Sequence, residues 1–148
     1  MKRLANESIF QRFLRKSLSY NYLERSKFKK NHGNEYTEKG VSDIDGHIGG
    51  KYVAIECKMW NGRPSTSQLA FSRGVMKTGG LSLFCIYHYY GGDHSFYWIP
   101  GDMVFSYRTK MLWIRTGLIS VKEDPNSDSN KQTLVADCSP IAQLLEMR

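Results

Sequence analysis

Apolar and polar positions alternate with a period of two on both sides of Gly49-Gly50. Two such runs separated by two glycines predict a β-hairpin, because a tight two-residue turn needs positive φ at its centre. Counting back from that turn places Asp43 directly opposite Glu56. A longer loop that included Lys51 would instead shift the register and turn one strand over relative to the other.

The same alternation places Asp43, Asp45, Glu56 and Lys58 on one face of the hairpin, with apolar residues on the other. Directly paired residues have Cβ atoms only about 4.5–5.5 Å apart, so Asp43 and Glu56 repel each other unless they share a cation. We therefore interpret this face as a divalent metal site beside a lysine. The alternative is the exposed face of a half-buried hairpin, which carries ordinary surface charge.

Helical spacing of apolar residues predicts a first helix over about residues 6–22, with Arg12 on its basic side. Glu7 lies one heptad before Leu14 and therefore falls on the apolar stripe. An acid there needs a partner, because isolated buried charge is costly. It is either directed at the metal site or a helix-start acid that is favourable to the helix dipole.

A serine or threonine at positions 65–67 can cap a second helix, which runs to about Thr78 and is stopped by two glycines. Gln68 shares a stripe with apolar residues of this helix, so its side chain should face the sheet near the site. Residues 81–90 and 95–99 follow as strands, since they are rich in aromatic and β-branched residues. The crossover helix suggests that strand 81–90 runs parallel to the strand before it.

Residues 25–39 are basic, polar and rich in turn formers, which predicts a loop. A short C-terminal helix is predicted from Ser139-Pro140 to Arg148. The whole pattern predicts an α/β fold with a central mixed β-sheet flanked by helices. We expect a single domain over residues 1–148, with a C-terminal elaboration over about residues 101–148.

Positive charge is concentrated at the start of the chain. Residues 1–40 hold ten Lys/Arg and four Asp/Glu, a net of +6, whereas the whole chain has a net charge of +7. Concentrated basic charge beside a local acidic site suggests that a polyanion is held in place while metal chemistry is done on it. Against this, some basic proteins bind no nucleic acid.

Other features of the composition exclude several classes. No run approaches the roughly 20 apolar residues that span a bilayer, so no membrane contact is expected, and the N-terminus lacks the apolar stretch of a signal peptide. The widely spaced Cys57, Cys85 and Cys138 indicate reduced core cysteines in a cytoplasmic protein. No Cys/His cluster has zinc-site spacing, which argues against a zinc enzyme.

The residues Ser42-Asp43 followed by Glu56-Cys57-Lys58 resemble the motif of the PD-(D/E)xK nuclease superfamily, with Ser in place of Pro. Within it, the chain is most similar to small Holliday-junction resolvases of the Hjc and RecU types and to stand-alone VRR-NUC domains. Glu7 in the first helix, Gly-x-x-Asp before the hairpin and Gln68 on the second helix also match. The resemblance covers roughly residues 5–100 and implies a restriction-endonuclease-like core.

The resemblance also implies roles for these residues. Asp43, Glu56 and the backbone carbonyl of Cys57 would bind Mg²⁺, for which Mn²⁺ could substitute, since hard oxygen ligands suit such ions. Lys58 would hold or activate the attacking water and offset charge in the transition state. Gln68 would orient that water or a phosphate oxygen, and Glu7 would contribute a further acid.

We therefore expect a Mg²⁺-dependent DNA endonuclease that cuts branched DNA such as four-way junctions. A homodimer is expected, because symmetric junction cleavage needs two active sites at a fixed spacing. The alternatives are a sequence-specific endonuclease of restriction or homing type on the same fold, and a catalytically silent DNA-binding module. Basic side chains in polar surroundings are the candidate DNA contacts: Arg12, Lys27, Lys29, Lys30, Lys39 and Arg63.

Overall fold

The structure, a computed structural model, describes residues 1–22, 26–31, 42–103 and 113–146. In chain order the described elements are α1 (Glu7–Asn21), β1 (Ser26–Lys30), β2 (Ile44–Ile48), β3 (Lys51–Met59), α2 (Thr66–Lys77), β4 (Leu81–Tyr90), β5 (Asp93–Pro100), β6 (Ile114–Thr116), β7 (Leu118–Lys122), β8 (Gln132–Ala136) and α4 (Pro140–Glu146). The two predicted helices of the first half and the strands that follow them are confirmed, with ends that differ by a few residues.

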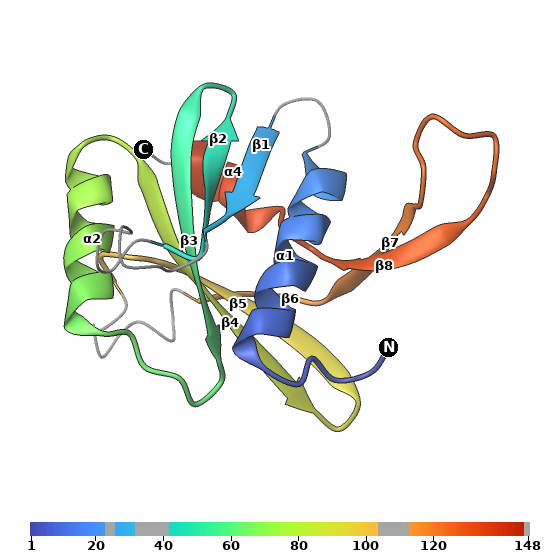
Figure 1. Cartoon of the computed structure of the whole chain (residues 1–148), viewed down its shortest axis with the longest axis horizontal. Helices are drawn as coiled ribbons and strands as arrows, with labels where there is room; N and C mark the ends of the chain where they lie inside the picture. Colours follow the sequence, from blue (N-terminus) through green and yellow to red (C-terminus); the bar gives the residue numbers. More distant parts are fainter. Residues whose placement is uncertain (23–25, 32–41, 104–112, 147–148) are drawn as a thin grey trace.

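Six of the described strands form one mixed sheet in the order β1-β2-β3-β4-β5-β6 (Figure 1). The β3–β4 pair is parallel, as predicted from the crossover helix, and its neighbours β2–β3 and β4–β5 are antiparallel hairpins. The predicted α/β class, with a central mixed sheet flanked by helices, is confirmed.

The sheet buries both faces at its centre, and a different helix covers each. Ile55 and Cys85 belong to the larger core cluster, into which α1 inserts Leu14. Phe84 lies on the opposite face, because side chains alternate along a strand, and Leu69 of α2 packs against its cluster. The α1 face therefore carries the larger apolar cluster, whereas the α2 face also carries Glu56 and Lys58 of β3.

The predicted turn between β2 and β3 is confirmed. Both residues of Gly49-Gly50 have positive φ, 55° and 83°, a region that favours glycine. The ladder ends at the pair Ile44 and Ile55. One residue further along, Asp43 faces Glu56, as the sequence predicts for this register.

The predicted loop over residues 25–39 is wrong in its first part, because residues 26–30 form the edge strand β1, antiparallel to β2. Phe28 packs against the core, while Lys27 and Lys29 on either side of it are exposed. This alternation is a strand signal that is masked by the surrounding basic residues. Lysines also suit an edge strand, because charge there discourages pairing with another chain. Most of the remaining predicted loop lies outside the described residues.

The C-terminal third contains an element that the sequence interpretation did not include. Strands β7 and β8 form a separate two-stranded antiparallel ribbon, which projects away from the main sheet (Figure 1). Helix α4 follows Ser139, as predicted, and continues to Glu146, while the predicted end at Arg148 lies outside the described residues. Cys138 and Ile141 join the same core cluster as α1.

Polar side chains at the end of α1 bond directly to this C-terminal segment. Ser17 Oγ accepts the Ala136 N–H at 3.0 Å, and Asn21 Oδ1 accepts the Cys138 N–H at 3.0 Å. Asn21 Nδ2 also donates to the Ala136 carbonyl at 3.0 Å, and the Tyr22 hydroxyl donates to the Cys138 carbonyl at 2.5 Å. We call Ser17, Asn21 and Tyr22 the α1 clamp. It joins residues 115 to 119 positions apart in the chain.

The three cysteines are free and buried, which confirms their assignment as reduced core residues. None of the described helices combines the length and apolarity needed to cross a membrane.

Candidate metal centre

Three acidic side chains from separate parts of the chain meet at the end of the β2–β3 ladder. Glu7 comes from the first turn of α1, Asp43 directly precedes β2, and Glu56 lies on β3. One carboxylate oxygen of each lies within 4.8 Å of the others. We call these residues the acidic centre. The structure thus brings Glu7 to the pair that the hairpin register predicts.

The side chain of Asp43 is held by the backbone of β3. Its Oδ2 accepts the Cys57 N–H at 2.8 Å, at the place where the next ladder bond of an antiparallel pair would form. The Ser42 carbonyl, the expected partner of that N–H, accepts instead from Asn31 Nδ2 at 2.9 Å. Asn31 also donates its N–H to the Asp43 carbonyl at 2.7 Å. The β2–β3 ladder therefore opens at Asp43, where the Cys57 N–H binds a carboxylate instead of a backbone carbonyl.

Asn31 is a supporting residue that the sequence interpretation missed. It follows β1 within a segment that was predicted as a loop, and a single Asn in a polar stretch carries no signal for such a contact.

The direction of the Cys57 backbone follows from the same contact. In an antiparallel pair, the N–H and C=O groups of one residue face the same neighbouring strand. Because the Cys57 N–H faces Asp43, its carbonyl is directed toward that side as well, whereas its thiol is buried in the α1 core. This orientation is the one that a carbonyl ligand requires, and the metal contact itself stays a prediction.

Gln68 connects α2 to the acidic centre. Its Oε1 accepts the Ser65 N–H at 2.8 Å, and Ser65 Oγ accepts the Gln68 N–H at 3.1 Å, which together form a capping box. The capping box fixes which end of the amide is free, and Nε2 donates to Glu56 Oε1 at 2.7 Å. The prediction that Gln68 faces the sheet near the site is confirmed. Its predicted role toward a water or phosphate oxygen is not tested by these contacts.

Burial and crowding raise the pKa values of Glu56 and Glu7. Glu56 is only 4% exposed. Its pKa is raised well above the usual range, first by burial and then by a hydrogen bond with Asp43 and by repulsion from it, while Lys58 acts in the opposite direction. Burial also raises the pKa of Glu7, which Lys58 lowers and Asp43 raises. When all three acids are ionised, the single lysine leaves an excess of negative charge, which a proton or a cation relieves.

Lys58 lies two residues after Glu56 on the same face of β3 and is only 9% exposed. The turn that follows β3 covers its aliphatic stem, because a Cβ placed at Gly62 would lie 3.4 Å from Lys58 Cδ. Its charge acts on both Glu7 and Glu56. A buried ammonium of this kind is strongly biased toward contact with anions.

Asp45 lies outside the acidic centre. Its Oδ2 accepts from the Tyr52 hydroxyl at 2.8 Å, and its Oδ1 lies 4.0 Å from Lys29 Nζ of β1. Burial, followed by this hydrogen bond, raises the pKa of Tyr52 above its usual range. These contacts make Asp45 a residue that links β1 to β3.

The candidate DNA contacts lie on several elements. Arg12 is exposed on α1, Lys27 and Lys29 are exposed on β1, and Lys30 at the end of β1 is half-buried. Arg63 is exposed in the turn after β3. Lys39 lies outside the described residues. The three β1 lysines are carried by the strand next to β2, which leads to Asp43.

The donor set of the acidic centre suits a hard divalent cation. It offers carboxylate oxygens, and the Cys57 carbonyl is directed to the same side. Among the described residues, no other group of three His, Cys, Asp or Glu side chains offers such a site.

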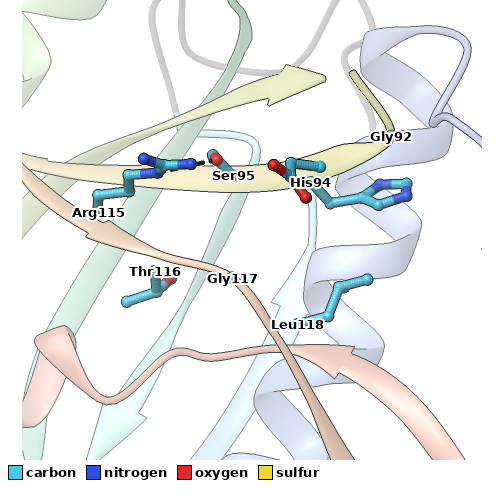
Figure 2. A pocket seen from close by; sticks show the side chains of 8 residues that line it. Gly92, His94, Ser95, Arg115, Thr116, Gly117 and Leu118 are labelled. Atoms are coloured by element: carbon cyan, nitrogen blue, oxygen red, sulfur yellow. Dashed lines mark hydrogen bonds between the residues drawn. The ribbon is translucent and has the colours of Figure 1, made fainter. Parts of the chain in front are cut away.

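A hollow of about 510 Å³ lies at the start of β5, and no residue of the acidic centre lines it. Figure 2 shows the Arg115 guanidinium extending toward Ser95, and Arg115 Nε donates to Ser95 Oγ at 3.0 Å. Asp93 lines the same hollow. The Arg115 guanidinium in this hollow therefore already has a hydrogen-bond partner within the protein, Ser95.

No family model matches the chain, and no curated protein matches its sequence. Among solved structures, the chain is similar to Hjc of Archaeoglobus fulgidus, a Holliday junction resolvase from an archaeal hyperthermophile, with 18% sequence identity and a TM-score of 0.46. The similarity covers 72% of this chain and 86% of that chain. Function is therefore inferred from the residues themselves.

Proposed function

We propose that this chain is a divalent-metal-dependent endonuclease that hydrolyses phosphodiester bonds in DNA. The observation that carries the proposal is the acidic centre, in which carboxylates of Glu7, Asp43 and Glu56 lie within 4.8 Å beside the buried Lys58. The sequence resemblance to PD-(D/E)xK nucleases supports the same function. We treat residues 1–148 as one nuclease domain.

In this proposal, Asp43, Glu56 and the Cys57 carbonyl hold a Mg²⁺ ion, with Glu7 as a further acid and Mn²⁺ as a substitute. Such an ion polarises the phosphate and lowers the pKa of a bound water. The chain supplies the geometry: the Cys57 N–H orients Asp43, and the capping-box amide of Gln68 orients Glu56. Groups held in place this way need little rearrangement during reaction.

Lys58 then acts on the phosphate that is being cleaved. Its ammonium holds the attacking water and offsets the negative charge that develops on the phosphate oxygens as the new P–O bond forms and the old one breaks. Burial strengthens this effect, since charge interactions grow as water is excluded.

The charge of the chain supports DNA as the polyanion. The net charge is +7, although the catalytic residues themselves are mostly acidic. Arg12, Lys27, Lys29, Lys30, Lys39 and Arg63 are proposed to contact phosphates, which fixes the position of the duplex without reading its sequence.

We further propose branched DNA, such as a four-way junction, as the preferred substrate, and a homodimer as the active form. Symmetric cleavage of a junction needs two centres at a fixed spacing. A sequence-specific endonuclease and a catalytically silent DNA-binding module are the competing functions.

The first experiment measures cleavage of a labelled four-way junction and a matched linear duplex, with Mg²⁺ or EDTA. The variants are Asp43→Ala and, as a control, Asp128→Ala, which removes an exposed acid from the loop between β7 and β8. We expect paired nicks in the junction that EDTA and Asp43→Ala abolish and Asp128→Ala does not.

Other outcomes decide among the alternatives. Cutting of particular linear duplexes would indicate a sequence-specific endonuclease. Tight DNA binding without cleavage of any substrate would leave a binding module and overturn the catalytic proposal.

A further inference from the structure

An exposed tryptophan directly follows β3, the strand that carries Glu56 and Lys58. Trp60 follows Lys58 by two residues, at the end of β3, and 41% of its surface is exposed. Its ring centroid lies 4.1 Å from that of His88, with 32° between the planes, and 5.2 Å from that of Tyr97. Trp113 meets it edge-on at 6.1 Å. We call Trp60 with the rings of His88, Tyr97 and Trp113 the Trp60 platform.

The platform is packed on its protein side. The Gly62 N–H donates to the Met59 carbonyl at 2.7 Å and closes a turn that holds Trp60 in its second position. The ring is therefore supported from below by its neighbours while part of it remains open to solvent. An aromatic ring that is ordered before binding loses little conformational entropy when a ligand stacks on it.

A hollow of about 270 Å³ adjoins the platform, and the positively charged Arg3 is among the residues that line it. It is lined by Arg3, Met59, Trp60, Asn61 and His88 together with parts of β4. The Leu4 N–H donates to the Tyr87 hydroxyl at 3.2 Å, and Leu4 is buried, so the N-terminal segment is anchored beside this hollow. The same segment leads directly into Glu7. One short stretch of chain therefore connects Arg3, at the hollow, with the acidic centre.

An aromatic surface, a guanidinium and a phosphodiester-cleaving centre together match the chemistry of a nucleotide. Stacking of a base on an aromatic side chain needs a free π face, which a base inside a continuous duplex does not offer because its neighbours cover both faces. A base at a branch point, a frayed end or a single strand does offer one. Arg3 supplies charge for its phosphate.

We propose that the Trp60 platform stacks an unpaired nucleobase of the DNA strand whose phosphate lies at the acidic centre. This deepens the proposed function, on which it rests, because it makes an unpaired base, rather than the shape of the duplex, the feature that selects branched substrates. The hollow in Figure 2 has no comparable exposed ring, and its Arg115 is already hydrogen-bonded to Ser95.

The test measures DNA binding in EDTA, so that it does not depend on cleavage. Fluorescence anisotropy with labelled oligonucleotides compares a single strand and a forked duplex with a fully paired duplex of the same length. The variants are Trp60→Leu, which keeps apolar bulk but has no π face, and Trp60→Phe, which keeps a ring. Leu134→Ala on β8 is the control, since Leu134 is 44% exposed and lies on the ribbon.

We expect Trp60→Leu to weaken binding of the single strand and the fork by about 5- to 150-fold, the range for loss of one stacked base. Binding of the paired duplex should change little, and Trp60→Phe should retain most of the affinity. Arg3→Ala should reduce the salt dependence of fork binding by about one phosphate contact. Circular dichroism melts establish that each variant is folded.

Equal affinity of Trp60→Leu and the original chain for the fork would overturn the proposal. So would equal losses on fork and duplex, or a change from dimer to monomer in sedimentation, which would make the platform an interface between two copies. The endonuclease proposal is judged separately. If the protein cleaves junctions but Trp60→Leu leaves fork binding unchanged, the endonuclease proposal stands and the platform proposal fails. If the protein cleaves no substrate but Trp60→Leu selectively weakens fork binding, only the platform proposal stands.

Discussion

The β2–β3 and β4–β5 hairpins turn through the same pair of residues, Gly-Gly, with φ of 55° and 83° in the first and 59° and 88° in the second. Beyond the turn they differ. The β4–β5 ladder continues without a break to the pair Leu83 and Pro100 and buries large rings such as Phe96. The β2–β3 ladder stops at Ile44 and Ile55, and charged residues follow at once.

The two hairpins share the turn that sets their geometry but differ in what their strands carry, apolar core residues in one and charged residues in the other. The turn fixes pairing and register in both cases. In the second hairpin the pairs from Tyr87 and Phe96 onward add to the core. In the first, the ladder ends early, and the free Cys57 N–H then binds the Asp43 carboxylate. A strand pair that opens at one end thus buries fewer apolar side chains there, but its unpaired backbone groups can bind charged side chains.

The largest expected change in activity comes from removing one acid from the first hairpin, β2–β3. Glu56→Gln should reduce metal-dependent cleavage by about 10³-fold or more, because metal polarisation is worth several kcal/mol and each 1.4 kcal/mol is a factor of ten. Because the raised pKa keeps Glu56 protonated in the metal-free folded protein, Gln resembles its neutral form, and the melting temperature in EDTA should not fall. Single-turnover cleavage and thermal melts measure the two effects. A variant that lost both activity and stability would show that Glu56 is needed for folding rather than for the metal.

The corresponding change in the second hairpin should act on stability alone. Phe96 is fully buried and stacks near Phe10 and Tyr87. Phe96→Ala should lower the free energy of unfolding by about 3–5 kcal/mol, as is usual for a large ring in a core. Urea unfolding measures this, with Tyr90→Ala as the control, since Tyr90 is 77% exposed and should change stability by less than about 0.5 kcal/mol. A small effect of Phe96→Ala would mean that the second hairpin is not the packed partner of the pair.

Gln68 sharpens the comparison, because it supports the first hairpin from α2. Gln68→Ala should lower cleavage by about 10- to 100-fold, the usual effect of losing a group that orients a metal ligand. It also removes the capping box, at about 1 kcal/mol of stability. Ser65→Ala removes the same cap but leaves Gln68 in place, so it should cost similar stability and much less activity. Equal activity of the two variants would assign Gln68 to the helix end alone.

The smallest expected effect is a dependence of stability on pH and metal. Because the pKa of Glu56 is raised above its ordinary value of 4.5, the folded protein holds a proton that the unfolded chain has lost. The metal-free protein should therefore lose stability as the pH rises above about 5. We expect a fall in melting temperature of about 2–4 °C, the shift for roughly 1 kcal/mol in a chain of this size.

Added Mg²⁺ should counter that fall, and more strongly at pH 8 than at pH 6, since it favours ionised carboxylates. Glu56→Gln should flatten the pH dependence. A melting temperature that rises with pH in EDTA would contradict the raised pKa of Glu56.

The parts of the fold that the sequence predicts are those fixed by local chemistry. The Gly49-Gly50 turn determines the register that brings Asp43 opposite Glu56, and a capped helix determines the direction of Gln68. These signals lie within about a dozen residues of one another, where turn and helix periodicities are strongest.

The parts that were missed depend on distant partners. Strand β1 is recognised only when β2 lies beside it, because lysines on both sides of Phe28 resemble a solvent-exposed loop. The β7–β8 ribbon is half-exposed, and its apolar residues do not alternate with a clear period of two, so they give little strand signal. Asn31 extends the β1–β2 pairing by donating its N–H to the Asp43 carbonyl, and nothing in the neighbouring sequence indicates that contact.

The α1 clamp has a consequence for the order of events during synthesis. Ser17, Asn21 and Tyr22 are made early, but their partners at Ala136 and Cys138 are made more than a hundred residues later. Contacts of such long sequence separation form late, because the loop between them must be closed first. Since α1 also carries Glu7, we expect the acidic centre to reach its final geometry only after residues 136–138 have been made and have packed against α1. Until then, a growing chain would hold Asp43, Glu56 and Lys58 without a finished centre.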